Sequence, residues 1–312
     1  MTTKDFRTDM HFSFGLALSR MCANLCGRAG LRTIAASAGH KKDALIRSHL
    51  EKILTPLLEQ YAQDDETGSY TPDAPIWVCW WTGEESAPPL VKRCIRSIRE
   101  NAGDHPVHLI DRDNYGTYLQ IPEHILSKVS DGTMCIANFS DYLRFSLLAA
   151  YGGLWLDATI YCPDPIPEDY FRLPLFTCKG TLGDPGGYLS AYRWTSFCFG
   201  GYRGNVMFRY MQQAFDSYWQ ICDRAIDYLL VDYLIDLGYR KLHPIRRLLD
   251  AVPENNLHRD DLQAAMNAAL PASAFASVLH PDTALYKLSW RETYAKETSD
   301  AQDSIFHMFL TH

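Results

Sequence analysis

The residues with the clearest chemical potential lie on a helix expected over residues 137–151. Asp141 and Arg144 are three positions apart, so both face the same side of that helix. The carboxylate of Asp141 could accept hydrogen bonds from sugar hydroxyls, and the guanidinium of Arg144 could bind a ribose, a sugar or a phosphate. A structural ion pair has the same spacing, and the residues alone leave the two interpretations equally open.

A strand expected over residues 154–161 supplies two further oxygen atoms. Side chains alternate along a strand, so Asp157 and Thr159 point to the same face. In open α/β sheets, ligands bind beyond the carboxyl ends of the strands. A carboxylate there could hold a ribose hydroxyl and a divalent cation, and the cation would neutralise the diphosphate of a leaving nucleotide. Asp157 could instead cap a turn.

The strands that would position these residues begin after residue 72. A strand over 75–81, a helix over 89–99 and a strand over 107–110 form a β-α-β unit, which starts a parallel sheet. The loop after the first strand lacks the G-x-G-x-x-G pattern, so a classical dinucleotide site is disfavoured. We therefore predict an α/β fold with a Rossmann-like catalytic domain over 73–312.

The first 72 residues follow a different pattern. Apolar residues recur at helical spacing over 11–26 and 41–61, and Pro56 is expected to kink or split the second helix. A polar segment over 64–73 then predicts a linker. The chain is accordingly divided into an N-terminal helical extension over 1–72 and the catalytic domain.

The overall composition disfavours several classes of protein. The formal net charge is −7, so the chain has no global positive field for nucleic acid, and we expect no nucleic-acid partner. Its nine cysteines include no C-x-x-C pair, which argues against a zinc ribbon or a disulfide framework and favours reduced thiols. No apolar run reaches about 18 residues, so no transmembrane helix is expected, and the predicted location is cytoplasmic.

Three segments, taken in order, resemble a known family. Ile76–Gly83, Ser140–Arg144 and Tyr151–Thr159 are similar to segments of the bacterial capsular polysaccharide synthesis glycosyltransferases. That family is related to sugar transferases with a DXD motif, including a group of mannosyltransferases and the large clostridial glucosylating toxins. The resemblance covers residues 75–165 well and the C-terminal third weakly. It implies a GT-A fold, a nucleotide-sugar donor that we expect to be a UDP-sugar, and retention of the anomeric configuration.

The resemblance also implies roles for individual residues. It places Trp80 beside the nucleobase and gives Asp157 contacts with the ribose and a metal, while the Asp141 and Arg144 pair contacts the donor sugar. The wider superfamily has a second aspartate where this chain has Thr159, so a lower metal affinity is expected without loss of activity. The predicted donor-binding residues are Trp80, Thr82, Gly83, Asp141, Arg144, Tyr151, Asp157, Thr159, Lys287 and Trp290.

Further candidates lie in the second half of the chain. Asp232, on a helix expected over 224–237, could reach the acceptor, with a polar pair between packed helices as the alternative. Lys287 could steady a phosphate and Trp290 could cover the donor, with a surface lysine and a core tryptophan as the alternatives. His307 could bind a metal or lie in the core. The predicted catalytic residues are Asp141, Arg144, Asp157 and Asp232, and the predicted ligands of a Mn²⁺ or Mg²⁺ ion are Asp157, Thr159 and His307.

Together these features predict a metal-dependent glycosyltransferase of capsule or exopolysaccharide synthesis. The acceptor is expected to be a glycan or a lipid-linked glycan. No well-placed second carboxylate is visible as a base, so a front-face mechanism is favoured, in which the leaving phosphate helps to deprotonate the acceptor. An effector-type transferase that modifies a protein and a non-catalytic nucleotide-sugar binding module are the alternatives.

The N-terminal helix expected over 11–26 could also make a peripheral contact with the inner face of the cytoplasmic membrane. Basic residues Arg20, Arg28 and Arg32 lie near its apolar side chains, and this combination suits an interface with anionic lipid. A helix that packs on the catalytic domain, or forms a dimer contact, is the alternative. The apolar side chains are Phe12, Phe14, Leu16, Leu18 and Met21.

Overall fold

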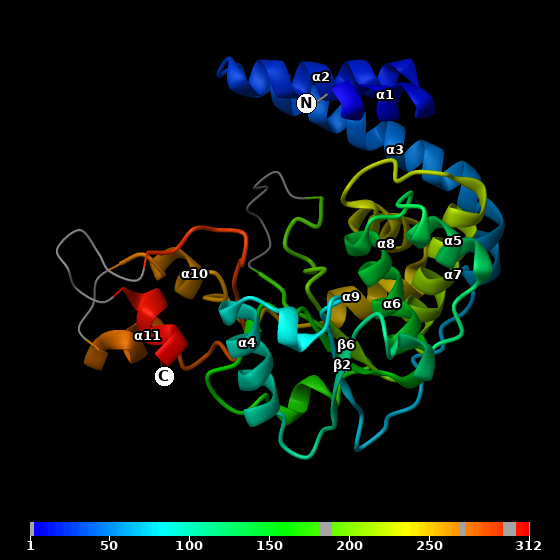
Figure 1. The fold of residues 1–312 in the computed structure, drawn as a ribbon. Coiled ribbons are helices and arrows are strands. Elements are labelled where there is room, and N and C mark those ends of the chain that lie inside the picture. The colour runs from blue at the N-terminus through cyan, green and yellow to red at the C-terminus, as the bar shows by residue number, and fades with distance from the viewer. Residues whose placement is uncertain (1–2, 181–188, 269–271, 296–303, 312) are drawn as a thin grey trace.

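A five-stranded sheet lies at the centre of the fold, in the strand order β2-β1-β3-β6-β5 (Figure 1). The computed structural model describes residues 3–180, 189–268, 272–295 and 304–311. Strands β2 and β3 pair in parallel with β1, whereas β6 runs antiparallel to both β3 and β5. The strands of this sheet are β1 (Ile76–Cys79), β2 (Val107–Ile110), β3 (Gly153–Leu156), β5 (Leu175–Thr177) and β6 (Cys198–Gly201).

The alternation of side chains along the strands divides the interior into two hydrophobic cores. Trp77 and Trp155 belong to the core on one face, and Val78 and Leu154 belong to the core on the other. All four side chains are buried, so the middle strands are covered on both faces, as parallel sheets usually are. The predicted α/β class, with a Rossmann-like parallel core and a helical N-terminal region, is confirmed.

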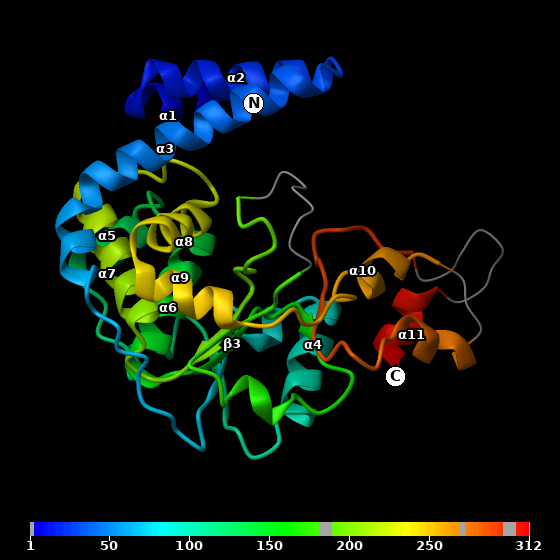
Figure 2. The same cartoon turned by 180° about the vertical axis from the view of Figure 1, so that it is seen from behind.

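The helices fall into two groups around the sheet (Figures 1 and 2). The first group, α3 and α5 to α9, covers the face that carries the two tryptophans, and the second group, α4, α10 and α11, lies on the opposite side. The first group is α3 (Arg32–Tyr61), α5 (Glu123–Ser130), α6 (Ile136–Tyr151), α7 (Val206–Ile221), α8 (Leu230–Lys241) and α9 (His243–Ala251), and the second is α4 (Pro89–Glu100), α10 (Asp261–Ala265) and α11 (Ile305–Thr311).

The N-terminal helices form a layer at one end of the molecule (Figure 1, dark blue). Helix α2 (Phe14–Arg28) packs against both α1 (Thr3–Phe12) and α3. The single helix expected over 11–26 is wrong, because Ser13 is extended and its hydroxyl caps α2 by accepting a hydrogen bond from the backbone N–H of Leu16.

Helix α3 begins nine residues earlier than predicted, at 32 rather than 41, and continues through Pro56 without being split. Its second half buries Leu50, Leu54 and Leu57 in the main core, where α3 contacts α7 and α8. This burial offsets the hydrogen bond that a proline removes from a helix. The domain boundary at residue 72 stays a prediction.

Two predicted elements near the site have different bounds in the structure. The strand expected over 154–161 ends at Leu156, and a turn over 157–159 separates it from the short strand β4 (Ile160–Tyr161). Strand β4 pairs antiparallel with β7 (Tyr286–Lys287), which brings the C-terminal segment to the end of β3. The helix expected over 224–237 begins only at Leu230. None of the helices in the described ranges has the length and apolar character that crossing a membrane requires.

Candidate active site

A cavity of about 400 Å³ opens at the carboxyl ends of β1 and β3. We call it the first cavity. Helix α6 forms one wall, and the segment that follows β7 forms another. This is the edge of the sheet where the chain topology places ligands in α/β folds. Its lining residues include Cys79, Trp80, Ser140, Asp141, Arg144, Asp157, Thr159, Ser196, Tyr228, Lys287, Trp290 and Arg291.

Arg144 joins the two carboxylates that the sequence singled out. Its Nη1 donates to Oδ1 of Asp141 at 2.6 Å, and its Nη2 donates to Oδ1 of Asp157 at 3.1 Å. The side chain is 4% exposed, and its guanidinium lies over the ring of Trp155, 5.0 Å from the centroid. Because both hydrogen-bonded partners and the ring fix its plane, Arg144 is held rigidly at the cavity wall.

Lys287 completes a network of alternating charges. Its ammonium donates to Oδ2 of Asp157 at 3.1 Å and to Oγ1 of Thr159 at 2.6 Å. The pairing of Ile160 with Lys287 between β4 and β7 sets this position. Trp155 adds a third hydrogen bond to Asp157, from Nε1 to Oδ1 at 3.1 Å. Both oxygens of Asp157 therefore already accept hydrogen bonds from protein groups.

The electrostatics of the two carboxylates differ. Burial raises the pKa of Asp157, but the charges of Lys287 and Arg144 outweigh it, so its pKa lies below the ordinary value and the group is ionised at neutral pH. Burial also raises the pKa of Asp141, and here it outweighs the charge of Arg144, which leaves a pKa of about 6. Asp141 is thus the group of this network whose charge changes closest to neutral pH.

The predicted metal ligands do not fit a divalent cation as they stand. Asp157 and Thr159 do converge on one point, but the ammonium of Lys287 occupies that point. The third predicted ligand, His307, lies on α11, which contacts α4, and it lines neither this cavity nor the neighbouring one described below. A cation would have to displace Lys287 to use these two oxygens.

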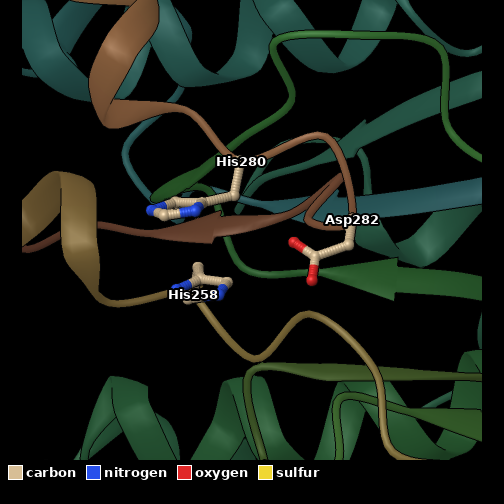
Figure 3. Close-up of side chains that lie close together, drawn as sticks. All are labelled: His258, His280 and Asp282. Carbon is tan, nitrogen blue, oxygen red and sulfur yellow. The ribbon is translucent and has the colours of Figure 1, made fainter.

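Another cluster in the described ranges has the composition of a metal site: His258, His280 and Asp282 (Figure 3). The two imidazole rings are stacked, with centroids 3.7 Å apart and planes 8° apart, and Figure 3 shows them face to face. Oδ2 of Asp261 lies 2.9 Å from Nδ1 of His258 and 3.2 Å from Nε2 of His280. A bound ion lies in the plane of each imidazole ligand, so rings stacked in parallel do not share one ion.

Two tryptophans stand at the mouth of the first cavity. The rings of Trp80 and Trp290 meet edge to face, with centroids 5.6 Å apart, and Trp290 is 44% exposed. Within the described part of the chain, Nε1 of Trp80 and Nε of Arg144 are buried without a hydrogen-bond partner. Buried polar atoms without partners are rare in folded proteins and recur where a ligand binds.

A second cavity, of about 490 Å³, adjoins the first and shares Ser196 and Leu229 with it. Asp232 lines this second cavity rather than the first. Its Oδ1 accepts a hydrogen bond from Nε1 of Trp194 at 2.9 Å, and burial raises its pKa. The lining residues include Gly39, Lys42, Asp43, Ser190, Tyr192, Trp194, Thr195, Ser196, Phe197, Leu229, Asp232, Tyr233 and Arg259.

The structure brings seven of the predicted residues together and leaves others apart. Tyr151 lies before β3 begins, at the opposite end of the strand from Asp157, and its hydroxyl donates to the backbone of Tyr118. Thr82 and Gly83 form the turn after β1 and line neither cavity. The positions of Tyr151, Thr82 and Gly83 do not support a place in the donor site. The position of His307 does not support a place in the metal site. The residues brought together at the first cavity are Trp80, Asp141, Arg144, Asp157, Thr159, Lys287 and Trp290.

Several lining residues were not predicted, among them Ser140, Ser196 and Trp194. Ser140 is adjacent to Asp141 in the sequence, and the shared motif could have indicated it. Ser196 and Trp194 lie in a loop segment without a recognisable pattern. Only the tertiary structure shows that this loop separates the two cavities.

Comparison with known proteins places the chain in a family. The family model described as "Capsular polysaccharide synthesis protein" matches residues 31–309. The chain belongs to this family. The family predicted from three motifs is thereby confirmed, and the match also includes all of α3, which lies within the predicted extension.

A curated relative is the O-glycosyltransferase braB of Annulohypoxylon truncatum, which is 34% identical over 97 residues. The match covers 28% of this chain and 23% of that protein, so the chain is similar to about a quarter of the length of this relative. No solved structure matches the chain.

Proposed function

We propose that this member of the capsular polysaccharide synthesis family is a glycosyltransferase that moves a sugar from a nucleotide-sugar, with a UDP-sugar as the expected donor, to a glycan acceptor. The observation that carries the proposal is the network of Asp141, Arg144, Asp157 and Lys287 at the end of β3, inside a cavity of about 400 Å³. Small-molecule sites have this size, and perturbed titratable groups in a cavity favour a functional site over a structural one.

The first cavity suits the charge that sugar transfer creates. The bond between the anomeric carbon and the diphosphate oxygen breaks, so negative charge develops on the leaving nucleotide. Arg144 and Lys287 are two fixed cations beside that space, and fixed charges stabilise developing charge without reorganisation. The new bond forms to an acceptor hydroxyl, whose proton passes to the leaving phosphate. This front-face route retains the anomeric configuration and requires no protein base.

In this scheme Lys287 and Arg144 provide the positive charge that a metal ion supplies in other transferases. Their contacts with Asp157 support this choice, because the predicted cation would compete with Lys287 for Asp157 and Thr159. A Mn²⁺ or Mg²⁺ ion would supply the same neutralisation of the diphosphate, held by those two oxygens. A metal requirement stays a prediction, and activity after exhaustive chelation is the measurement that decides between the two.

The two tryptophans support a place for the nucleobase. Trp80 lines the first cavity, and the half-exposed ring of Trp290 stands at right angles to it. A flat ring can stack on Trp290 or Trp80 without a specific pattern of hydrogen bonds. We propose that the base lies against this pair, which orients the diphosphate toward Arg144 and Lys287.

The experiment that tests the function is a titration of the full chain, in EDTA, with UDP, UDP-sugars and GDP-sugars, followed by assay of donor hydrolysis. We expect one nucleotide to bind and its sugar-nucleotide to be hydrolysed slowly without an acceptor. Binding without any turnover would favour the non-catalytic module. Binding of none of these nucleotides, with or without Mn²⁺, would refute the proposal. Transfer to proteins but not to glycans would favour the effector-type enzyme.

We also propose that the N-terminal helices contact anionic lipid, which would bring a lipid-linked acceptor close. The structure changes the surface expected from sequence, because Leu16 is buried and Arg20 is paired with Asp9 and Asp227. Residues 10–42 contain five lysines and arginines and no aspartate or glutamate, although the whole chain carries a charge of −7. The large apolar residues exposed in this segment are Met10, Phe14, Leu18, Leu25, Leu31 and Ile34.

Phe14, Leu18 and Leu25 lie on one face of α2, at positions i, i+4 and i+11. We expect the chain to sediment with phosphatidylglycerol vesicles and not with phosphatidylcholine vesicles, because basic residues add about 1 kcal/mol each at an anionic surface. Serine at these three positions should abolish sedimentation. Serine at the exposed Ile221 and Leu257 is the matched control. Equal binding by both variants would refute the lipid contact.

A further inference from the structure

The second cavity has the surface chemistry of a sugar site. Aromatic side chains from Trp194, Phe197 and Tyr233 line it beside hydroxyl and charged groups. The rings of Trp194 and Tyr233 are buried, whereas Phe197 is partly exposed and offers a flat face to an apolar sugar surface. Combined with groups that bind hydroxyls, this makes the lining suitable for a carbohydrate. With about 490 Å³, it is larger than the first cavity, in which the donor is proposed to bind.

Its position relative to the first cavity is also informative. The two cavities share Ser196 and Leu229, so a ligand in one lies next to a ligand in the other. Asp232 stands near this boundary, because Leu229 and Val231, which precede it in the chain, line the first cavity. Its charge also helps to raise the pKa of Asp141. Asp232 is therefore electrostatically coupled to the donor side although it lines the second cavity.

Asp232 has one oxygen committed and one available. Oδ1 accepts the hydrogen bond from the indole of Trp194, whose ring is buried and fixes the carboxylate. Among the residues that the structure describes, no donor contacts Oδ2. An available carboxylate oxygen between two connected cavities can accept a hydrogen bond from a sugar hydroxyl.

We propose that the second cavity binds the acceptor sugar, with the attacking hydroxyl donating a hydrogen bond to Oδ2 of Asp232 and pointing toward the first cavity. The inference rests on the proposed function and adds the place of its second substrate. The hydrogen bond orients the hydroxyl oxygen toward the anomeric carbon, and the proton still leaves to the diphosphate as the new bond forms.

If the acceptor binds in the second cavity, the N-terminal region contributes to acceptor binding. Gly39, Lys42 and Asp43 of α3 form one wall of the second cavity, and α3 belongs to the helical layer with the exposed apolar surface. The hydroxyl of Tyr233 donates to Asp43 at 2.6 Å, which ties this wall to α8. An acceptor held here contacts both the N-terminal helices and the catalytic domain.

Gly39 offers a direct way to fill the second cavity. A Cβ atom added at this position meets no atom within 4 Å, and the residue lies inside α3 without a positive φ. Gly39→Phe therefore introduces a ring into the cavity without backbone strain, and a glycine in a helix interior is replaced at no cost in helix propensity. Ala36→Phe adds the same ring almost one turn away, at an exposed position outside the cavity.

The test uses the full chain and a panel of octyl glycosides of common hexoses with UDP- and GDP-sugars. The donor and glycoside that wild-type protein converts fastest become the assay pair. For Gly39→Phe we expect the ratio of glycoside transfer to donor hydrolysis to fall at least tenfold, with the apparent KM for the glycoside raised. Ala36→Phe should keep the wild-type ratio.

Failure of the proposed function and failure of the acceptor cavity give different results. A wild-type chain that converts no pair refutes the proposed function, and the acceptor cavity falls with it. If wild type converts a pair and Gly39→Phe transfers with the same ratio and KM, the acceptor lies elsewhere and only the cavity assignment is refuted. If both variants melt at the wild-type temperature, misfolding does not explain a lower ratio of transfer to hydrolysis in Gly39→Phe. That result supports the assignment of the acceptor cavity.

Discussion

Two buried groups of carboxylates and arginines differ in their surroundings. In the first cavity, Arg144 links Asp141 to Asp157, and Lys287 contacts Asp157 from the other side. The other group surrounds Asp236 on α8, which is fully buried. Oδ2 of Asp236 lies 2.5 Å from Nε of Arg47 and 2.9 Å from Nε of Arg240, and Oδ1 lies 3.6 Å from Nη2 of Arg193.

A buried ion pair therefore does not by itself mark a functional site. Asp236 lines neither cavity, and its partners come from α3, from α8 itself and from the loop that precedes β6, so it joins separate elements of the fold. Asp157 directly follows a sheet strand and lines the first cavity. Location at the strand end, rather than charge, distinguishes the two groups.

The largest expected effect is at Asp157. Asp157→Asn keeps the shape and removes the charge that holds Arg144 and Lys287 in place. We expect transfer to fall about 10³-fold, as when one preorganised electrostatic contact of an active site is lost. Donor hydrolysis and transfer rates measure the effect, and circular dichroism checks the fold. A folded variant with wild-type turnover would place the donor elsewhere.

The matched change at Asp236 should act on stability instead. Asp236→Asn leaves three arginines around a neutral group, and breaking a buried ion pair costs about 3–5 kcal/mol of unfolding free energy. Urea denaturation measures this loss, and the turnover of the remaining folded protein should stay close to wild type. If turnover falls as far as in Asp157→Asn, the distinction between the two groups is wrong.

A substitution at Lys287 tests whether cationic side chains or a metal ion neutralise the leaving diphosphate. Lys287→Met removes the charge and keeps most of the side-chain volume, so we expect transfer in EDTA to fall about 10²-fold. The change also frees Asp157 and Thr159, and Mn²⁺ should then restore part of the activity of the variant. Wild-type activity that disappears on chelation would show that the ammonium does not replace a metal.

Asp141 should set the acid limit of activity. Its pKa is raised to about 6 from 3.8, so Asp141 loses its negative charge as the pH falls through about 6, and transfer should fall with it. Stability should change in the opposite direction: between these pKa values the folded state binds more protons than the unfolded state, so rising pH disfavours folding. A pH–rate profile of wild type and Asp141→Asn measures the effect on activity, and urea denaturation over the same pH range measures the effect on stability. An unchanged acid limb in the variant would exclude Asp141.

The smallest effect is expected at Trp80. Trp80→Ala removes the ring and should weaken nucleotide binding by about 1–3 kcal/mol, whereas Trp80→Phe keeps a stacking surface and should weaken it less. Calorimetric titration with UDP compares the two variants. Equal affinities in both would make Trp80 a packing residue at the cavity mouth.

Local patterns predicted much of the fold and part of the site. The β-α-β unit lies within a few residues of its predicted bounds, because apolar periodicity and the flanking prolines and glycines are local signals. The shared face of Asp141 and Arg144 follows from helical spacing alone. The alternation assigned to Asp157 and Thr159 was wrong, since a turn begins at Asp157, but the two oxygens still converge.

The family, the class of fold and the pair on α6 could be predicted from the sequence, because each depends on residues close together in the chain. The remaining features depend on contacts between distant segments. Lys287 is 130 positions from Asp157, and only the pairing of β4 with β7 brings its ammonium to the point predicted for a metal. Tyr151 belongs to the same motif as Asp157, yet four residues of extended strand carry it to the other end of the sheet. A cavity is formed by side chains that chain topology brings together, so the boundary between the two cavities has no signature in any one segment.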